Sequence, residues 1–228
     1  MKVATWNIHR GWGMDGRYDP GRIISVIAEI GPDIMALQEA QHYVRRAVPM
    51  LDPHRLAQES DLVPVVVRQE PDHQGWRSNV LLIRKGLKLR GCAEGLRLGG
   101  WEPRGAISAW LETGCSTLQV ICAHLSLGRS RRIWQAERLL EAAGGDGTPT
   151  LLLGDFNERH SNGKMMSMLS TRFSRPSKVA TFPAPWPVWS LDRILADPAS
   201  MLHDVAVHNT RQARRASDHL PLTASLSI

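Results

Sequence analysis

The clearest hydrophobic pattern in the chain is a short apolar run that ends at polar residues. The three leucines at 151–153 follow one another without alternation, which predicts a strand buried on both faces. Gly154 interrupts the run, and Asp155 and Asn157 follow two residues apart. If the extended backbone continues past Gly154, both side chains point to the same side. A carboxylate and a carboxamide then lie together at the end of a buried strand, although these residue types are also common in turns.

The same arrangement recurs along the sequence. Further apolar segments each deliver a polar residue at or near one end, and these residues are Asn7, Glu39, His124, Asp192, Asp218 and His219. A purely structural protein has no reason to repeat this pattern. A metal-assisted active site has one, because it must gather carboxylates, amides and imidazoles at one edge of a sheet.

A helical pattern connects the first two of these strands. Asp19 is placed as an N-cap and Pro20 at the first helical position. One apolar face at helical spacing follows, formed by Ile23, Ile24, Ile27 and Ile30. Because a crossover helix returns the chain to the same end of a sheet, parallel strands here place Asn7 and Glu39 at one edge.

Other elements are predicted from weaker patterns. Strands are expected over 63–68 and 79–84, a helix over 131–143, and short helices with loops within 41–61 and 159–177. Pro64 favours an edge strand. The segment at 181–189 is rich in proline and tryptophan, which predicts a loop, and it leads directly to Asp192. We therefore expect this loop beside the site.

Composition narrows the class of protein. A chain of 228 residues with 43% hydrophobic and 22% charged residues suits one folded α/β domain over 1–228. The net charge of +6 favours an anionic partner, such as nucleic acid, a phosphorylated small molecule or an acidic lipid surface. Basic proteins without such partners are common, so the charge is supporting evidence.

Cysteine usage and hydropathy bear on the compartment. The three cysteines, Cys92, Cys115 and Cys122, are odd in number and lack the paired spacing of metal sites. Free thiols in a reducing compartment are the simple interpretation. The sequence has neither a signal-peptide pattern nor an 18-residue apolar run, so we expect a cytoplasmic protein without a transmembrane segment.

Six motifs together resemble the endonuclease/exonuclease/phosphatase superfamily. They occur in the family's order over nearly the whole chain, and they are Thr5-Trp6-Asn7, Leu37-Gln38-Glu39, Ala123-His124-Leu125, Gly154-Asp155-Phe156-Asn157, Leu191-Asp192-Arg193-Ile194 and Ser217-Asp218-His219-Leu220-Pro221. The resemblance implies a deoxyribonuclease-like fold, a four-layer sandwich of two mixed β-sheets flanked by helices. It also implies a metal-dependent hydrolase of phosphate esters.

The resemblance assigns metal-binding roles. Glu39 is the expected central ligand, with Asp218 and Asn7 close by. Mg²⁺ suits such oxygen ligands, since it typically takes one or two carboxylates, waters and substrate phosphate; Mn²⁺ is an expected substitute. Asp155 is expected to orient or deprotonate the attacking water, and Asn157 to hold a phosphoryl oxygen.

Two histidines are expected in the site. Asp192 would hydrogen-bond one nitrogen of His219 and favour the charged ring. His219 would then contact the phosphate or assist proton transfer. His124 is similar to a histidine found in the deoxyribonuclease, sphingomyelinase and phosphatase branches but absent from the exonuclease III branch. It would protonate the leaving oxygen or stabilise the phosphoryl group.

Arginines surround these motifs. Arg104 matches a family position that heads a strand near the site, although a surface charge fits equally well. The others in segments expected at the catalytic edge are Arg10, Arg17, Arg129, Arg131, Arg132, Arg211, Arg214 and Arg215. Those at 129–138 form either a phosphate-facing rim or a solvated helix face, and the solvated face is the default.

Two substrate classes remain open. The charge favours a nuclease acting on DNA or RNA, whereas the compact chain favours a phosphatase or phosphodiesterase acting on small-molecule or lipid phosphates. A third hypothesis is a catalytically inactive module that binds polyanions. Loss of catalysis would leave a motif position vacant, and every matched position is filled. Oligomeric state has no signal in the sequence.

Overall fold

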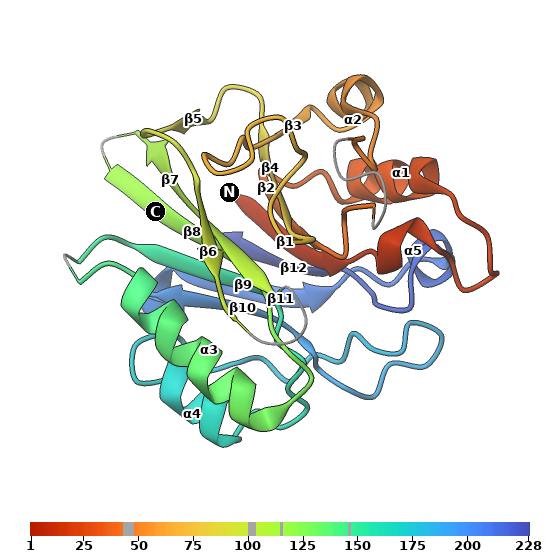
Figure 1. The fold of residues 1–228 in the computed structure, drawn as a ribbon. Coiled ribbons are helices and arrows are strands. Elements are labelled where there is room, and N and C mark those ends of the chain that lie inside the picture. The colour runs from red at the N-terminus through yellow and green to blue at the C-terminus, as the bar shows by residue number, and fades with distance from the viewer. Residues whose placement is uncertain (43–47, 100–103, 115, 146) are drawn as a thin grey trace.

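The computed structural model describes residues 1–42, 48–99, 104–114, 116–145 and 147–228. Within these residues, two mixed sheets pack face to face with helices on their outer faces (Figure 1). The first sheet has the order β11 (Leu202–Val207), β12 (Leu222–Leu226), β1 (Lys2–Asn7), β2 (Ile34–Gln38), β4 (Val80–Arg84) and β3 (Leu62–Pro64). The expected two-sheet sandwich is thereby confirmed.

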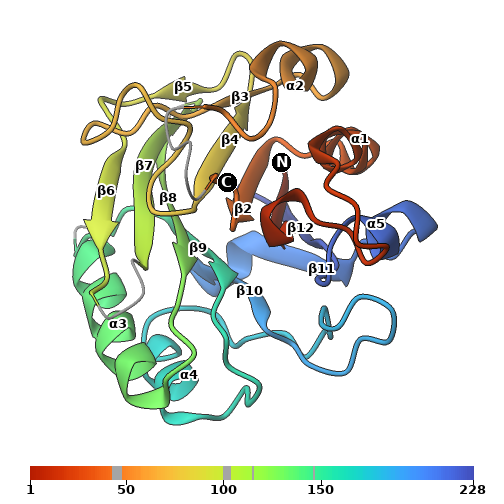
Figure 2. The same cartoon turned by 45° about the vertical axis from the view of Figure 1, so that its right-hand side comes forward.

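The second sheet contains the Leu-rich strand. Its order is β10 (Asp192–Asp197), β9 (Thr150–Asp155), β8 (Ser116–His124), β7 (Gly105–Thr113) and β5 (Lys88–Leu89), and β6 (Glu94–Arg97) also pairs with β7. Every residue of β9 is buried, as the unbroken leucine run predicts. Figure 2 shows this sheet facing the first one across the middle of the molecule.

Helices cover both outer faces. Beside the first sheet lie α1 (Pro20–Ile30), α2 (Pro53–Glu59) and α5 (Arg211–Ala216), and beside the second lie α3 (Arg129–Ala142) and α4 (Lys164–Leu169). Three apolar clusters fill the spaces between these layers: one between the sheets, one under α1 and one under α3. None of the helices in the described parts of the chain is long and apolar enough to cross a bilayer.

Strand register explains why polar residues gather at one edge. β1 and β2 are parallel and pair Asn7 with Gln38, so Glu39 follows at the same end. β8 and β9 are parallel and pair His124 with Asp155, and the antiparallel strand β10 places Asp192 opposite Asp155. The ends of two sheets therefore meet at a single site.

Local sequence signals account for α1. The Asp19 carboxylate accepts a hydrogen bond from the Arg22 amide at 3.0 Å, and Pro20 occupies the first turn. The helix ends at Gly31, whose left-handed φ of 60° suits a residue without a Cβ. The predicted isoleucine face is buried.

Several predicted bounds were wrong. The strand expected over 63–68 is shorter: β3 ends at Pro64, on the edge of the first sheet. Val67 instead forms an isolated bridge with Ala93, the residue before β6. The long helix begins at Arg129 rather than at 131.

Cys92 is an exposed free thiol and Cys122 a buried one, while Cys115 lies outside the described residues.

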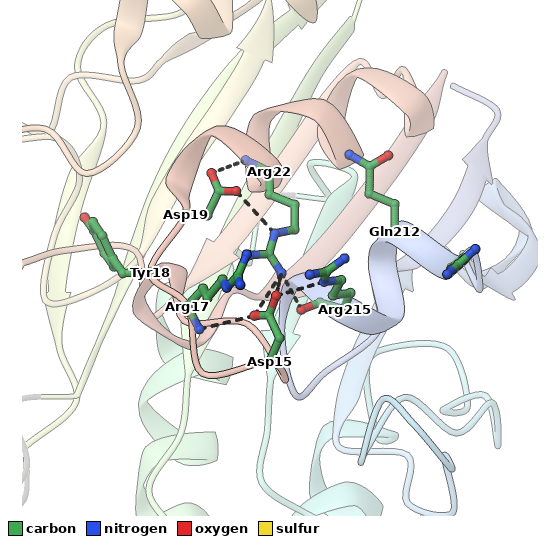
Figure 3. Close-up of a pocket in the computed structure, with 8 residues that line it drawn as sticks. Asp15, Arg17, Tyr18, Asp19, Arg22, Gln212 and Arg215 are labelled. Carbon is green, nitrogen blue, oxygen red and sulfur yellow. Dashed lines mark hydrogen bonds and ion pairs between the residues drawn. The ribbon is translucent and has the colours of Figure 1, made fainter.

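The loop after β1 is more ordered than the sequence predicts. After a 3-10 turn at His9–Gly11, Trp12 and Tyr18 form an antiparallel bridge, and the Gly13 amide donates to the Arg17 carbonyl at 2.9 Å. This hairpin, residues 12–18, is tied to α1 and α5 through Asp15, which contacts both Arg22 and Arg215 (Figure 3).

Candidate active site

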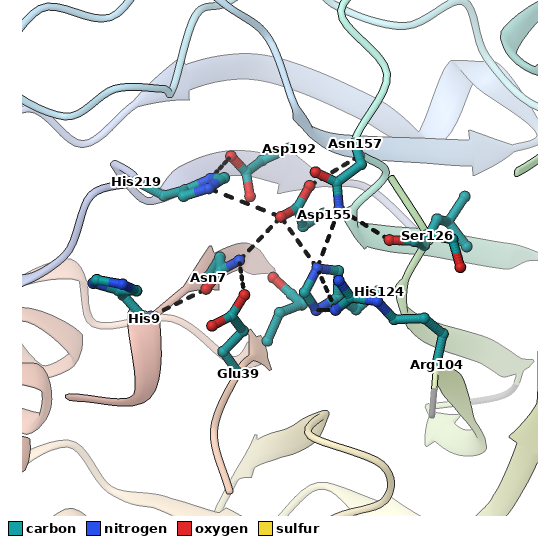
Figure 4. Close-up of polar contacts among 12 residues, drawn as sticks. Asn7, His9, Glu39, Arg104, His124, Ser126, Asp155, Asn157, Asp192 and His219 are labelled. Carbon is teal, nitrogen blue, oxygen red and sulfur yellow. Dashed lines mark hydrogen bonds and ion pairs between the residues drawn. The ribbon is translucent and has the colours of Figure 1, made fainter. Parts of the chain in front are cut away.

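Asn7 and Glu39 form one wall of a cleft at the shared strand edge. The Asn7 carboxamide donates to Asp155 Oδ2 at 3.0 Å and lies 3.4 Å from Glu39 Oε1 (Figure 4). Glu39 adopts a left-handed φ of 53°, which turns the chain sharply after β2. Arg10 Nε lies 3.6 Å from Glu39 Oε2. The two residues that the sequence predicts at one edge are therefore adjacent.

His124 and Asp155 form the floor of the cleft. His124 Nε2 lies 3.4 Å from Asp155 Oδ2, and both side chains are about 2% exposed. The neighbouring strands approach closely at Gly154, where an added Cβ would lie 1.8 Å from the Ala123 carbonyl oxygen. Glycine at this position therefore brings the two parallel strands, and the two functional groups at their ends, together.

Asn157 reaches the site by a different route from the expected one. The extended backbone ends at Asp155, and Asn157 has a left-handed φ of 51°. The turn is stabilised by the Asn157 amide, which donates to Asp155 Oδ1 at 2.9 Å. The Asn157 carboxamide then donates to the Leu125 carbonyl and lies 3.3 Å from His124 Nε2. The turn interpretation of this motif is correct, and Asn157 lines the cleft.

Asp192 and His219 form a buried pair above the floor. His219 Nδ1 lies 2.8 Å from Asp192 Oδ2, and His219 Nε2 lies 3.9 Å from Asp155 Oδ2. The Thr181 hydroxyl donates to the same Asp192 oxygen. Phe182 packs on the imidazole with ring centroids 4.7 Å apart. The expected loop at 181–189 thus lies beside the site and supports this pair.

Burial and charge separate the titration of the two histidines. Burial would lower the pKa of His219, but the charge and hydrogen bond of Asp192, with Asp155 and Asp218, raise it to about 10. Burial lowers the pKa of His124 well below its usual value, and the positive charges of Arg104, His219 and Arg10 lower it further. His219 is therefore cationic and His124 neutral at pH 7.

Asp155 titrates nearer to neutrality than an ordinary aspartate. Burial is the largest cause and raises the pKa of Asp155 to about 6; the charge of Asp192 also raises it, whereas His219 and the hydrogen bond from Asn7 oppose the rise. A carboxylate with a pKa in this range can accept a proton near pH 7 more readily than an exposed one.

Two groups of side chains in or beside the cleft have the chemistry of metal ligands. Asp155, Asp192 and His219 offer ligand atoms within 4.8 Å of one another. A cation bound by this trio would have to displace the proton of His219, whose pKa is raised to about 10, because ligation requires the neutral ring. Glu39 and Asp218 are different: their side chains are 20% and 28% exposed to the cleft. These hard oxygen ligands, with the Asn7 carboxamide nearby, match Mg²⁺ better than the buried trio does.

Arginines surround the cleft. Arg104 directs its guanidinium at the His124 ring, 2.7 Å from Nδ1 and 2.9 Å from Nε2. Arg159 lies over Trp189, 3.8 Å from the ring centroid. Arg132, which the default interpretation places on a solvated helix face, is instead buried in an ion pair with Glu158 at 3.0 Å. The helix therefore turns this arginine toward the cleft rather than toward solvent.

The cleft has a volume of about 830 Å³ and contains predicted and unpredicted residues. All the expected site residues line it except Asp192, which lies behind His219. The unpredicted lining residues include Leu127, Glu158, Arg159 and Phe182. No motif marks these four, because they come from loops whose positions depend on distant contacts. For Phe182 alone, the proline-rich pattern of its segment predicts a loop near the site.

Asn79, which immediately precedes β4, does not line the cleft. It is fully buried, and its carboxamide donates to the Gly105 carbonyl at 3.0 Å and approaches those of Trp76 and Arg77. These bonds connect the starts of β4 and β7, so Asn79 supports the fold.

Solved structures with the same fold cover the whole chain. A conserved protein of unknown function from Enterococcus faecalis V583 superposes with a TM-score of 0.76 at 20% identity, covering 100% of this chain and 99% of that one. A mannosyl-6-phosphatase from Bacteroides thetaiotaomicron VPI-5482 gives 0.72 at 18% identity, with 100% of both chains covered. Truncated TDP2 from Caenorhabditis elegans gives 0.70 at 16%, covering 100% and 97%.

Sequence comparison identifies the family. No curated protein matches the chain. The model of the Endonuclease/Exonuclease/phosphatase family matches residues 4–219, a span that contains every predicted site residue. The family consists of phosphoester hydrolases that generally depend on a divalent metal. The protein therefore belongs to the endonuclease/exonuclease/phosphatase family.

Proposed function

We propose that the protein is a Mg²⁺-dependent phosphodiesterase that cleaves the backbone of DNA or RNA. One observation carries the proposal. A single oxygen, Asp155 Oδ2, lies 3.0 Å from the Asn7 amide, 3.4 Å from His124 Nε2 and 3.9 Å from His219 Nε2. Hydrolysis of a phosphate ester requires a held water, neutralised phosphoryl oxygens and a stabilised leaving group. This convergence offers polar groups for all three.

The proposed metal ligands are Glu39 and Asp218, with Asn7 beside them. Their carboxylates line the cleft and retain access to it. A bound Mg²⁺ would supply positive charge to the phosphoryl oxygens and the leaving oxygen. Arg10, which lies against the outer oxygen of Glu39, would move or share that carboxylate when the cation binds.

The remaining roles follow from the protonation of each group. Asp155 would orient the attacking water and accept its proton, since its raised pKa of about 6 suits a base working near neutral pH. Cationic His219 would neutralise a phosphoryl oxygen, with Asp192 holding the ring. Neutral His124 and the Asn157 carboxamide would position another phosphoryl oxygen. Of the two roles expected for His124, the lowered pKa favours phosphoryl stabilisation over protonation of the leaving oxygen.

Charge supports nucleic acid as the substrate. The chain carries a net charge of +6, and Arg10, Arg104, Arg132 and Arg159 line the cleft. Several cations around an open cleft suit a backbone that carries many phosphates. The second candidate is a phosphatase or phosphodiesterase for small-molecule or lipid phosphates. The Bacteroides relative described as a mannosyl-6-phosphatase favours it.

A substrate panel tests the proposal. Purified protein is incubated with Mg²⁺ or with excess EDTA and given single-stranded DNA, RNA, plasmid, sphingomyelin, phosphatidylglycerol and inositol phosphates. We expect Mg²⁺-dependent cleavage of at least one nucleic acid at a higher kcat/KM than any other substrate. Turnover restricted to a small or lipid phosphate would establish the second candidate. Absence of turnover on every substrate would support the hypothesis of an inactive polyanion-binding module. Activity in excess EDTA would refute the metal dependence.

A further inference from the structure

A second cleft, of about 540 Å³, lies between the hairpin at 12–18 and α5, outside the catalytic cleft. Four arginines from three segments line it: Arg17, Arg22, Arg211 and Arg215. Asp15 and Asp19 are the acidic residues in its lining, so the arginines leave it with a positive charge. No role in the proposed reaction involves these side chains.

Two of the four arginines are fixed in place. Arg22 Nη1 lies 3.2 Å from both oxygens of Asp15 and donates to the Arg215 carbonyl at 3.0 Å. Arg215 Nε also donates to Asp15, at 2.8 Å from Oδ2 (Figure 3). The Arg215 hydrogen bond is the main cause that lowers the pKa of Asp15 to about 2. Asp15 therefore stays ionised and orients both guanidinium groups.

The other two arginines are available. The exposed guanidinium groups of Arg17 and Arg211 have neither a hydrogen bond nor an ion pair to any residue that the structure describes. Two oriented and two unengaged guanidinium groups around one hollow match a phosphate, which accepts several charge-assisted hydrogen bonds.

The cleft is built into the fold rather than formed by mobile surface side chains. A Cβ on Gly13 would lie 2.5 Å from the Arg215 carbonyl oxygen and 2.5 Å from Arg22 Nη1, so only glycine allows the hairpin to approach α5 this closely. The Met14 amide also donates to the Arg215 carbonyl at 3.0 Å. The hairpin and α5 therefore hold Arg22 and Arg215 at a defined spacing before any ligand binds.

The same two segments also form part of the catalytic cleft. His9 and Arg10, which immediately precede the hairpin, line the catalytic cleft, as does Asp218, which follows α5. Arg215 and Asp218 are three residues apart, so their Cα atoms are at most about 11 Å from each other. The two clefts therefore adjoin along the chain on both the hairpin side and the α5 side, so one extended ligand with several phosphates could reach both.

Exposed aromatic rings accompany the arginines. Tyr18 lines the second cleft and is 43% exposed, and Trp12, its partner in the hairpin, is 47% exposed. Their ring centroids lie 5.8 Å apart. Aromatic faces beside a basic groove are typical of proteins that bind single-stranded nucleic acid, because unpaired bases stack on the rings while cations contact the backbone.

We propose that the second cleft binds a phosphate of a single-stranded nucleic acid whose scissile phosphate lies in the catalytic cleft, and that Tyr18 and Trp12 stack against a neighbouring base. This inference rests on the proposed function, since it specifies which form of nucleic acid the enzyme prefers. Double-stranded DNA fits less well, because its bases are already stacked on one another.

The test compares Arg17→Gln and Arg211→Gln with Arg90→Gln. Arg90 is an exposed arginine near the far end of β7, next to Leu89, which pairs with Leu111. Each protein is assayed on a single-stranded DNA 12-mer and on bis(p-nitrophenyl) phosphate, a diester with one phosphate. We expect the ratio of kcat/KM for the 12-mer to that for the small diester to fall on the order of tenfold in each cleft variant. The ratio should be unchanged in Arg90→Gln.

Binding of the labelled 12-mer to the same variants in a Glu39→Gln background provides a second measurement. Each cleft variant should lower the log–log salt slope by about 0.7, the value for one contact with a single strand. The second-cleft proposal alone would be overturned if the 12-mer were cleaved but the ratios and slopes of the cleft variants equalled those of Arg90→Gln. Failure of the unmodified enzyme to bind or cleave the 12-mer would overturn the proposed nuclease function, and the second-cleft proposal with it.

Discussion

Asp192 Oδ2 lies 2.8 Å from His219 Nδ1, and both side chains are almost entirely buried. Thr181 donates to the same carboxylate oxygen, and Phe182 covers the imidazole. Because the ring is held on one side by Asp192, its other nitrogen faces Asp155 across the cleft. The pair therefore presents one oriented, positively charged imidazole to the cleft.

We expect Asp192 and His219 to act as one unit. Asp192→Asn and His219→Ala should each lower kcat by about 10²- to 10⁴-fold, because either change removes the oriented charged ring. The double variant should be little worse than the poorer single variant. Steady-state kinetics of the three proteins measures the coupling, and losses that multiply would show that the two side chains work independently.

Glu39 should be required for metal binding but dispensable for folding. Glu39→Gln keeps the shape of the side chain and removes the anionic ligand, so apparent stability in EDTA should match that of the unmodified protein. Mg²⁺ should raise the melting temperature of the unmodified protein, because a ligand at 100 times its Kd stabilises the folded state by about 2.7 kcal/mol. The variant should show no such rise. Glu137→Gln, on the exposed face of α3, is the matched control. An equal response to Mg²⁺ in Glu39→Gln would place the metal elsewhere.

Gly154 should be essential for stability. An alanine Cβ there would lie 1.8 Å from the Ala123 carbonyl oxygen, and φ is 150°. The overlap and backbone strain together should lower the free energy of unfolding by about 2 to 6 kcal/mol. Gly145→Ala is the control, since nothing lies within 4 Å of the added Cβ. Denaturant unfolding compares the two, and near-equal midpoints would contradict the close approach of β8 and β9.

The two described thiols should differ in reactivity. Burial raises the pKa of Cys122 to about 12, so this thiol stays protonated below that pH, whereas Cys92 is exposed. Iodoacetamide at pH 8 should alkylate Cys92 in the native protein and Cys122 only after denaturation. Peptide mass spectrometry separates the two positions from Cys115. Modification of native Cys122 at the rate of Cys92 would mean that the space between the sheets opens to solvent.

The sequence predicts the strand ends better than it predicts what surrounds them. The capped helix at Asp19 and the parallel crossover place Asn7 and Glu39 at one edge, and the leucine run places Asp155 at the end of a buried strand, because hydrophobic periodicity and connection rules are local. The contact of Thr181 with Asp192 and the burial of Arg132 against Glu158 depend on where separate loops and helices pack. Neither follows from local pattern, and the second cleft, formed by the hairpin and α5, was missed for the same reason.

In the proposed reaction, Asp155 directs water at a phosphodiester in a metal-dependent cleft. Single-turnover cleavage of a DNA oligonucleotide in H₂¹⁸O with Mg²⁺, followed by mass spectrometry of the fragments, tests it most directly. We expect one ¹⁸O in the new terminal phosphate for each cut, a rate at least about 10²-fold lower in Asp155→Asn, and no change in Glu137→Gln. Cleavage by Asp155→Asn at the unmodified rate, or fragments without ¹⁸O, would contradict it.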